Sequence, residues 1–348
     1  MKYGLPYKGS KNKLAERIVD FLPKRDHLID LFCGGCAVSH AALLTDKFPH
    51  IHINDENWMC PQLFLDALAG KYKDECRWVS REEFHRLKTT DPYVAMVWSF
   101  GNNMRDYLYS ADIEPLKRAI HYAMFFRDYQ PADELGFDLR FLDGITDIHD
   151  KYIKVKDFFR NTQHPRCQHF EGGVRLRQIG ERRAYNRHPC ALKVGGGTST
   201  IADRQNCKIL KPETELHRLQ YMERNRSMQF QPSTITPDRI TSSVLDYEQV
   251  YIPDDSVIYC DPPYAGTDAY KRDKGNQFDY PRFYDWCCRQ AQPVFISSYH
   301  MPADRFELVK AFSHRCTLSP TANNQVYECI FIPKGQKERG EWKEQRLF

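Results

Sequence analysis

The tetrapeptide Asp261-Pro262-Pro263-Tyr264 combines residue types that could bind a planar amine. Asp261 supplies a carboxylate acceptor, and the peptide carbonyl of Pro262 can supply a second. The paired prolines restrict the backbone, so we expect both oxygens to point in one direction. Tyr264 offers an aromatic face beside them. This set suits the exocyclic amine of a base, although proline pairs also occur in plain turns.

The apolar run SVIYC (256–260) comes directly before this tetrapeptide. It predicts a buried strand that ends at Asp261. Reacting groups in parallel α/β sheets lie beyond the carboxyl ends of the strands. The position therefore favours a functional site over a plain turn.

A nucleotide-binding βαβ pattern occupies the N-terminal region. The apolar run HLIDLF (27–32) enters a CGGC turn, and the segment AVSHAALLTDKF that follows is typical of a helix. HIHINDE (50–56) then alternates like a strand and ends in acidic residues. Strand, glycine turn, helix, strand and acid are together the layout of that unit.

Strand and helix signals return after residue 250, whereas residues 58–130 have a largely helical pattern. The predicted strands are PVFISSY (293–299) and VYECIFI (326–332), and the predicted helices are YPRFYDWCCRQA (280–291) and ADRFELVKAF (303–312). We therefore expect an α/β fold whose single Rossmann-like sheet is completed from both ends of the chain.

Positive charge is concentrated in the middle of the chain. Residues 151–230 contain 17 Lys and Arg against 7 Asp and Glu, a net charge of +10. The whole chain has 50 against 46, a net charge of +4, so the remainder carries −6. Contact with phosphates requires such a local excess, although a basic surface loop is the plainer alternative.

The composition, with 41% hydrophobic and 28% charged residues among 348, is that of a globular protein. No apolar run approaches the roughly 18 residues of a membrane helix. The N-terminus lacks the apolar core of a secretory signal. We therefore expect the 12 cysteines to be free thiols in a reducing cytoplasm.

With these motifs the sequence resembles the Dam-like DNA adenine methylases, the D12 class with the motif order called alpha. PYKGSKNKL (6–14) is similar to the family's aromatic-x-Gly-x-Lys cofactor segment, and DLFCGGCAV (30–38) to its Phe-x-Gly-x-Gly turn. NDEN (54–57) corresponds to the acidic end of the next strand. Cys36 replaces the second glycine of the turn and follows Gly35.

The resemblance implies a methyltransferase fold with S-adenosylmethionine as cofactor and double-stranded DNA as substrate. Its catalytic domain would comprise residues 1–130 and 235–335, with 131–234 as an inserted basic target-recognition domain and 336–348 as a polar tail. We expect a cytoplasmic enzyme of bacterial or phage origin that is a monomer or weak dimer. A restriction endonuclease is a candidate partner.

Matched residue by residue, the resemblance implies catalytic roles for Asp261, Pro262, Pro263 and Tyr264. The cofactor-binding positions correspond to Tyr7, Lys11, Asp30, Phe32, Gly34, Gly35, Asp55 and Asp261. Hydrogen bonds from the adenine amine to Asp261 and the Pro262 carbonyl would relieve the charge that develops on attack. The base would be flipped from the duplex and stacked on Tyr264.

Residues that could contact nucleic acid lie in two segments. SFGNNMRDYLY (99–109) contains types that contact bases and phosphates, which makes Asn103 and Arg105 candidates. A polar helix edge is the alternative for that segment. In the basic middle the candidates are Arg175, Arg177, Arg182 and Arg183.

Other functions stay open at this point. Cytosine-N4 methylation uses nearly the same tetrapeptide, usually with Ser or Asn first, so Asp261 favours adenine. An RNA adenine methylase and a non-catalytic DNA-binding regulator of the same fold are further alternatives. Pro189-Cys190 resembles the nucleophile of cytosine-C5 methyltransferases, but its place in the chain does not fit that family.

Two sets of residues could suggest a metal or redox site. One is Cys33-x-x-Cys36, which no second CxxC follows. The other comprises His164, Cys167, His169, His188, Cys190 and Cys207. The spacing of the second set matches no common zinc motif, so we expect no metal.

The basic middle predicts DNA binding that is driven by charge. Neutralising Arg182 and Arg183 together should weaken binding to specific and random duplexes alike, and should reduce the salt dependence by about one to two units of slope. Affinity measured over a salt series would check this. A loss confined to one DNA sequence would instead assign these arginines to base contacts.

Overall fold

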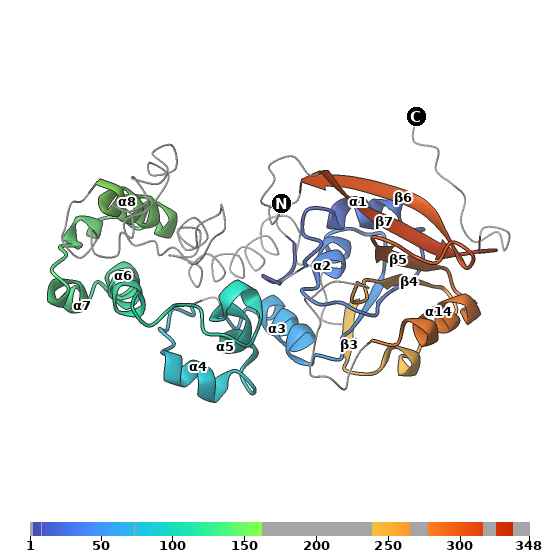
Figure 1. Cartoon of the computed structure of the whole chain (residues 1–348), viewed down its shortest axis with the longest axis horizontal. Helices are drawn as coiled ribbons and strands as arrows, with labels where there is room; N and C mark the ends of the chain where they lie inside the picture. Colours follow the sequence, from blue (N-terminus) through green and yellow to red (C-terminus); the bar gives the residue numbers. More distant parts are fainter. Residues whose placement is uncertain are drawn as a thin grey trace. The chain divides into compact units, whose positions relative to one another are not determined.

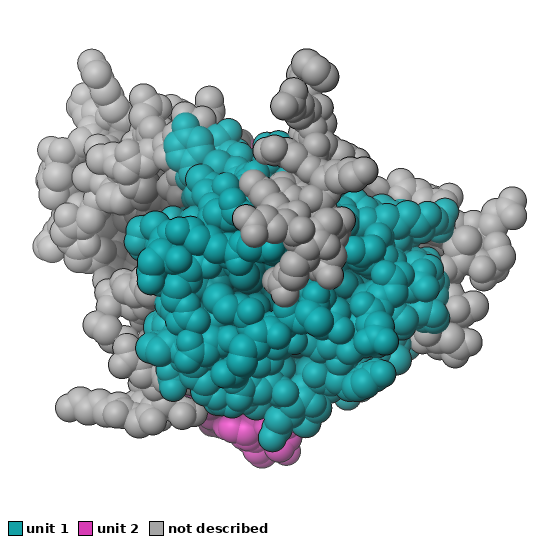
Figure 2. Space-filling view, turned by 90° about the vertical axis from the view of Figure 1, so that its right-hand side faces the viewer, with its two compact units in different colours: residues 1–71, 220–348 teal, residues 72–219 magenta. Residues whose placement is uncertain are grey.

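The computed structural model divides the chain into two compact units, residues 1–71 with 220–348 and residues 72–219. Figure 2 shows the described atoms of the first unit in teal as one continuous body. The structure describes residues 3–7, 9–72, 74–161, 239–264, 278–315 and 325–336. None of the helices in these ranges is long and apolar enough to cross a membrane.

The described strands of the first unit form one sheet in the order β3-β2-β1-β4-β5-β7-β6. They are β1 (His27–Asp30), β2 (His50–Asn54), β3 (Ile240–Ser243), β4 (Ser256–Cys260), β5 (Val294–Ser298), β6 (Phe306–Arg315) and β7 (Gln325–Pro333). The strands from β3 to β5 in this order pair in parallel, and β7 runs antiparallel to both β5 and β6. Blue strands from the N-terminal region thus lie beside yellow-to-red strands from the C-terminal region (Figure 1). The expected α/β fold, with one sheet completed from both ends of the chain, is confirmed.

Helices pack against both faces of this sheet. They are α1 (Ala15–Phe21), α2 (Ala37–Leu43), α3 (Met59–Leu68) and α14 (Tyr280–Arg289). Side chains of a strand alternate between the two faces. Ile258 of β4 packs with Phe283 of α14 in one core cluster, whereas Phe295 of β5 meets Phe21 of α1 edge to face at 6.0 Å.

The predicted helix over residues 303–312 is wrong, because the structure forms β6 there and pairs it with β7. A register irregularity between Leu308 and Lys310 inserts a bulge, and a bulge reverses the alternation of side chains. Phe306 consequently packs in the core on the α14 side, while Phe312 packs against Phe21 of α1. Apolar residues on both faces gave this strand a helix-like pattern.

The second unit is helical over its described residues, as the pattern up to residue 130 predicted. Its elements are α4 (Arg81–Leu87), α5 (Pro92–Val97), η1 (Phe100–Asn102), α6 (Glu114–Phe126), α7 (Gln130–Glu134), η2 (Arg140–Leu142) and α8 (Ile148–Asn161). Ser80 and Glu83 form a capping box that starts α4. The compact units divide at residues 71 and 219, whereas we expected the catalytic domain to extend to residue 130. The functional boundaries stay a prediction.

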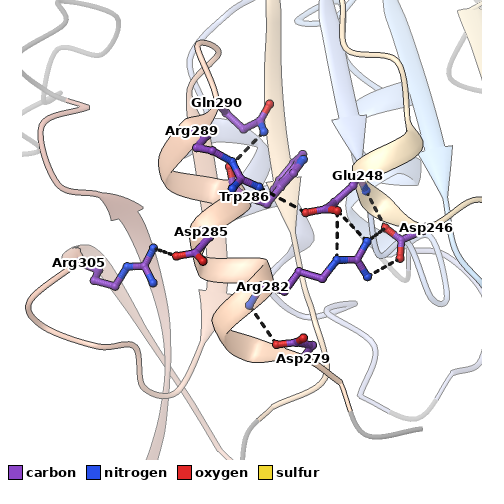
Figure 3. A network of polar contacts seen from close by, with 9 residues as sticks. All are labelled: Asp246, Glu248, Asp279, Arg282, Asp285, Trp286, Arg289, Gln290 and Arg305. Carbon is purple, nitrogen blue, oxygen red and sulfur yellow. Dashed lines mark hydrogen bonds and ion pairs between the residues drawn. The ribbon is translucent and has the colours of Figure 1, made fainter.

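An ion-pair network ties α14 to the connection between β3 and β4, which contains η4 (Tyr247–Gln249). The Arg282 guanidinium contacts Asp246 and Glu248 at 3.0 and 2.7 Å (Figure 3). These side chains are partly exposed, so their pairing contributes less than buried contacts do. The network holds one covering helix against the sheet.

The buried side chain of Asn54 joins the carboxyl ends of three strands. Its amide nitrogen donates to the carbonyls of Leu31 and Leu245 at 3.1 and 3.0 Å. Its oxygen accepts from the Ser243 hydroxyl and the Leu245 amide at 2.7 and 3.0 Å. Every polar group of this amide is therefore used to hold β1, β2 and the end of β3 together.

Asn54→Ala should lower the free energy of unfolding by roughly 2–4 kcal/mol, because it leaves the buried Leu31 carbonyl and the Leu245 amide and carbonyl without these partners. Chemical denaturation would measure the loss. Arg282→Ala is the control. It removes the partly exposed ion pairs of Arg282 with Asp246 and Glu248 and should have a clearly smaller effect. Equal losses in the two variants would contradict the importance assigned to Asn54.

Candidate active site

The glycine turn after β1 is shaped by two different constraints. Gly34 and Cys36 have φ angles of +45° and +54°, in the left-handed region that favours glycine. Gly35 instead has no space, because a Cβ there would lie 2.6 Å from the Cβ of Tyr7. Gly34 is favoured by its positive φ angle, and Gly35 by the lack of space for a side chain. Cys36 stands where the motif Phe-x-Gly-x-Gly has its second glycine, and its positive φ angle is one that glycine adopts readily.

The N-terminal segment lies directly on this turn. The Leu5 amide donates to the Gly35 carbonyl at 2.6 Å. A Cβ on Gly4 would lie 2.2 Å from that same carbonyl oxygen, so the two backbones approach closely. The segment that carries Tyr7 and Lys11 is thus held in place by the turn.

Asp55 fastens the end of β2 to the turn. One carboxylate oxygen accepts from the Gly34 amide at 2.8 Å, and the other accepts from the Asn57 amide at 2.9 Å. The structure therefore brings Asp55 and the glycine turn together. Its expected role in binding the cofactor stays a prediction.

Asp30, the last residue of β1, has a side chain that is almost fully buried. One oxygen accepts from the Ser39 hydroxyl at 2.6 Å, and the other has no hydrogen-bond partner among the described residues. Burial raises the pKa of Asp30 to about 7, although the Ser39 hydrogen bond opposes the rise. A carboxyl group with an unused oxygen therefore lies at the carboxyl end of the sheet.

Phe32 lies in the apolar core beneath the turn. Its ring contacts those of Tyr247 and Phe283, each at a centroid distance of 5.6 Å. These rings belong to the cluster under α14. Phe32 therefore supports the turn through packing.

Lys11 forms a nearly buried ion pair with Asp261. Its ammonium lies 2.8 Å from both carboxylate oxygens, and the Lys11 side chain is only 9% exposed. Burial alone would lower the pKa of Lys11, but the carboxylates of Asp261 and Glu328 reverse this and raise it. The structure pairs Lys11 with the first residue of the tetrapeptide, and its expected role in binding the cofactor stays a prediction.

Tyr264 is bound through both its ring and its hydroxyl. The hydroxyl lies 3.0 Å from Asp261 Oδ1 and also contacts Glu328 Oε1. The Lys11 ammonium lies 4.8 Å from the ring centroid, and the Tyr299 ring meets it edge to face at 4.7 Å. Removing the hydroxyl would thus change the site even if the ring still stacked.

The prolines between these residues lie at the end of β4. Pro262 is buried, and Pro263 is half-buried. The Pro263 carbonyl accepts from the Tyr280 hydroxyl at 3.0 Å. Tyr280 begins α14, so the tetrapeptide is attached to the helix that covers this face of the sheet.

Glu328 is a site residue that the sequence interpretation missed. It lies on β7, far from the tetrapeptide in sequence, and its side chain is 4% exposed. It accepts from the Ser297 hydroxyl at 2.8 Å and lies 3.8 Å from the Lys11 ammonium. An acidic residue within the apolar strand VYECIFI was the available signal, because a buried carboxylate needs partners.

Comparison with known protein families was made over the whole chain. Residues 7–129 match the family model of D12 class N6 adenine-specific DNA methyltransferases. This part of the chain is therefore similar to that family. No curated protein matches the chain. The matched range includes Lys11, the glycine turn and Asp55, whereas Asp261 and Glu328 lie beyond it. The similarity to this family supports, in general terms, a methyltransferase activity that acts on adenine in DNA.

The nucleic-acid candidates within the matched range lie in a tight loop of the second unit. The Asn103 side chain accepts from the Arg105 and Asp106 amides at 2.9 and 3.0 Å, so it shapes the loop itself. The Arg105 side chain is 77% exposed and pairs with Asp106 at 3.1 Å. The remaining candidates lie outside the described residues: Arg175, Arg177, Arg182 and Arg183.

The cysteines of the turn are buried thiols. Burial raises the pKa of Cys33 and of Cys36, which disfavours the thiolate that metal binding or redox chemistry requires. No group of three metal-ligating side chains occurs within the described ranges. The His and Cys residues between 164 and 207 lie outside the described residues.

Gly35→Ala should displace the N-terminal segment from the turn, because the added Cβ would overlap Tyr7. Overpacking of this kind costs about 1–3 kcal/mol. In a unit of this size each kcal/mol lowers Tm by roughly 2–4 °C. Thermal unfolding would measure the shift. Gly70→Ala is the control: it places a residue at φ +86° but contacts nothing within 4 Å. A larger shift in the control would contradict the crowding argument.

Proposed function

We propose that this protein is a site-specific DNA adenine-N6 methyltransferase that uses S-adenosylmethionine and acts on an adenine flipped out of the duplex. The observation that carries the proposal is the contact between Lys11 and Asp261, at 2.8 Å. It joins a residue within the range similar to the D12 family to the tetrapeptide, which lies outside that range. A non-catalytic DNA-binding regulator of the same fold would not need this ion pair, whose burial costs free energy.

The residues around the glycine turn fit a cationic cofactor. Asp30 has a buried carboxyl oxygen without a partner among the described residues, and Asp55 adds a second carboxylate at the turn. Gly34 and Gly35 lack side chains, and the Tyr7 side chain occupies the space beside them, so Tyr7 lies next to the turn. When bound, S-adenosylmethionine supplies an electrophilic methyl group. Tyr7, Asp30, Asp55 and the two glycines would hold it.

Asp261 is proposed to bind the amine of the target adenine. An ionised carboxylate accepts a hydrogen bond from that amine and stabilises the positive charge that develops on the nitrogen. The Lys11 ammonium favours the ionised form of Asp261, whereas burial and Glu328 raise the pKa of that carboxyl group. Positioning of this kind can account for much of the acceleration of a methyl transfer.

Tyr264 and the second unit are proposed to bind the DNA. The Tyr264 ring would stack on the flipped base, as base-flipping enzymes commonly require. Residues 131–234 would form the target-recognition region, whose excess of Lys and Arg suits phosphate contacts. Arg105, which is 77% exposed, is a further candidate for contact with the DNA backbone. We propose a cytoplasmic monomer or weak dimer, with a restriction endonuclease as a candidate partner.

Asp261→Asn should lower the rate of methyl transfer to adenine by about 10²–10³-fold, because the charge that stabilises the developing cation is lost. Affinity for duplex DNA should change little. Transfer of labelled methyl to adenine-containing and adenine-free duplexes would measure both activity and base choice. Asp285→Asn, on the exposed side of α14, is the control and should leave the rate unchanged. Near-normal transfer by Asp261→Asn would remove the basis of the proposal.

A further inference from the structure

Glu328 is a buried carboxylate that the mechanism above does not use. Its side chain is 4% exposed, and it lies on β7, away from the tetrapeptide in sequence. Burial of a charged group is costly unless it has partners. Among the described residues it contacts the Tyr264 and Ser297 hydroxyls and, at 3.8 Å, the Lys11 ammonium. Each of these except Ser297 also contacts Asp261.

The Tyr264 hydroxyl lies between the two carboxylates. Asp261 Oδ1 is 3.0 Å away, and Glu328 Oε1 is also in hydrogen-bond contact. A hydroxyl has a single hydrogen to donate, so it can donate fully to one carboxylate at a time. The other contact becomes a full hydrogen bond when that carboxyl group carries a proton and donates it to the phenol oxygen.

The charges of this cluster also favour one additional proton. In the part of the chain that the structure describes, the two negative charges of Asp261 and Glu328 are paired with the positive charge of one ammonium, that of Lys11. One proton on the carboxyl pair would make the cluster neutral. The titratable groups that face Asp261 in the described residues are Lys11, Asp30, Tyr259, Tyr264 and Glu328, and Tyr299 adds to the field at Lys11.

We propose that Glu328 is a second carboxylate of the reaction, and that Asp261 and Glu328 hold the proton released by the adenine amine through their shared contact with the Tyr264 hydroxyl. This inference rests on the proposed function. It assigns a task to the buried acid of β7 and to the hydroxyl of Tyr264.

The step is balanced within the site. As the bond between adenine N6 and the methyl carbon forms, the bond from that carbon to sulfur breaks and its electron pair stays on sulfur. The methylated nitrogen then gives its proton to Asp261. Asp261 passes a proton to the Tyr264 oxygen while the phenol proton moves to Glu328 Oε1. No additional oxidant, reductant or base is required.

The pH dependence gives a signature that a merely structural role would not produce. Methyl transfer needs ionised Asp261, so the rate falls as the pH falls through the pKa of that carboxyl group. Burial raises this pKa, Lys11 opposes the rise and Glu328 adds to it. Glu328→Gln should therefore move the acidic limb of the rate to lower pH, and Lys11→Met should move it to higher pH.

Single-turnover methyl transfer would be measured across pH for both variants and for Glu307→Gln, a partly exposed glutamate of β6 that serves as control. We expect Glu328→Gln to lower the rate at neutral pH by about tenfold or more, with KM for DNA changed by less than about threefold. Tyr264→Phe keeps both carboxylates but removes the shared hydroxyl, so it should lower the rate similarly. Glu307→Gln should match the wild type.

Infrared titration of the carboxyl groups in the cofactor-free protein supplies a second readout that does not depend on activity. The band assigned to Asp261 by its loss in Asp261→Asn should titrate at lower pH in Glu328→Gln than in the wild type. An unchanged acidic limb or an unchanged Asp261 titration in Glu328→Gln would overturn the inference. A wild-type protein that methylates no adenine would instead overturn the proposed function, whatever the titration shows.

Discussion

The ion pair between Lys11 and Asp261 is the interaction on which the rest of the site depends. It joins residues 250 positions apart, and the Lys11 side chain is only 9% exposed. Loss of one partner of a buried pair leaves an uncompensated charge, which typically costs about 3–5 kcal/mol. The N-terminal segment and the end of β4 must therefore be placed together before the tetrapeptide can have its observed form.

The glycine turn makes that placement possible. Gly35 has no side chain, so Tyr7 and the backbone of Leu5 can lie directly on the turn, and Lys11 follows a few residues later. Asp55 holds the turn from the other side through the Gly34 amide. Backbone contacts thus hold the N-terminal segment on the turn, and the Lys11 side chain then connects that segment to the tetrapeptide.

Charge is distributed differently in the two parts of the protein. Among the described residues, Asp30, Asp261 and Glu328 are buried or partly buried acidic groups of the site, and the Lys11 ammonium lies beside the last two. The middle of the chain carries the opposite sign, with a net charge of +10 over residues 151–230. An acidic site suits a cationic methyl donor, and a basic segment suits a polyanion. The modest net charge of the whole chain conceals this division.

The sequence by itself determined the parts of the protein that depend on local pattern. Apolar runs beside turn residues predicted β1, β4 and β5, and the family motifs predicted Asp261 and the glycine turn. Strand β6 was mistaken for a helix, because its bulge and its pairing with β7 are tertiary features that local periodicity does not encode. Only the tertiary structure decided that Lys11 pairs with Asp261 and that Glu328 joins them. Contacts between distant segments depend on the order and register of the strands, which the spacing of residues along one chain does not specify.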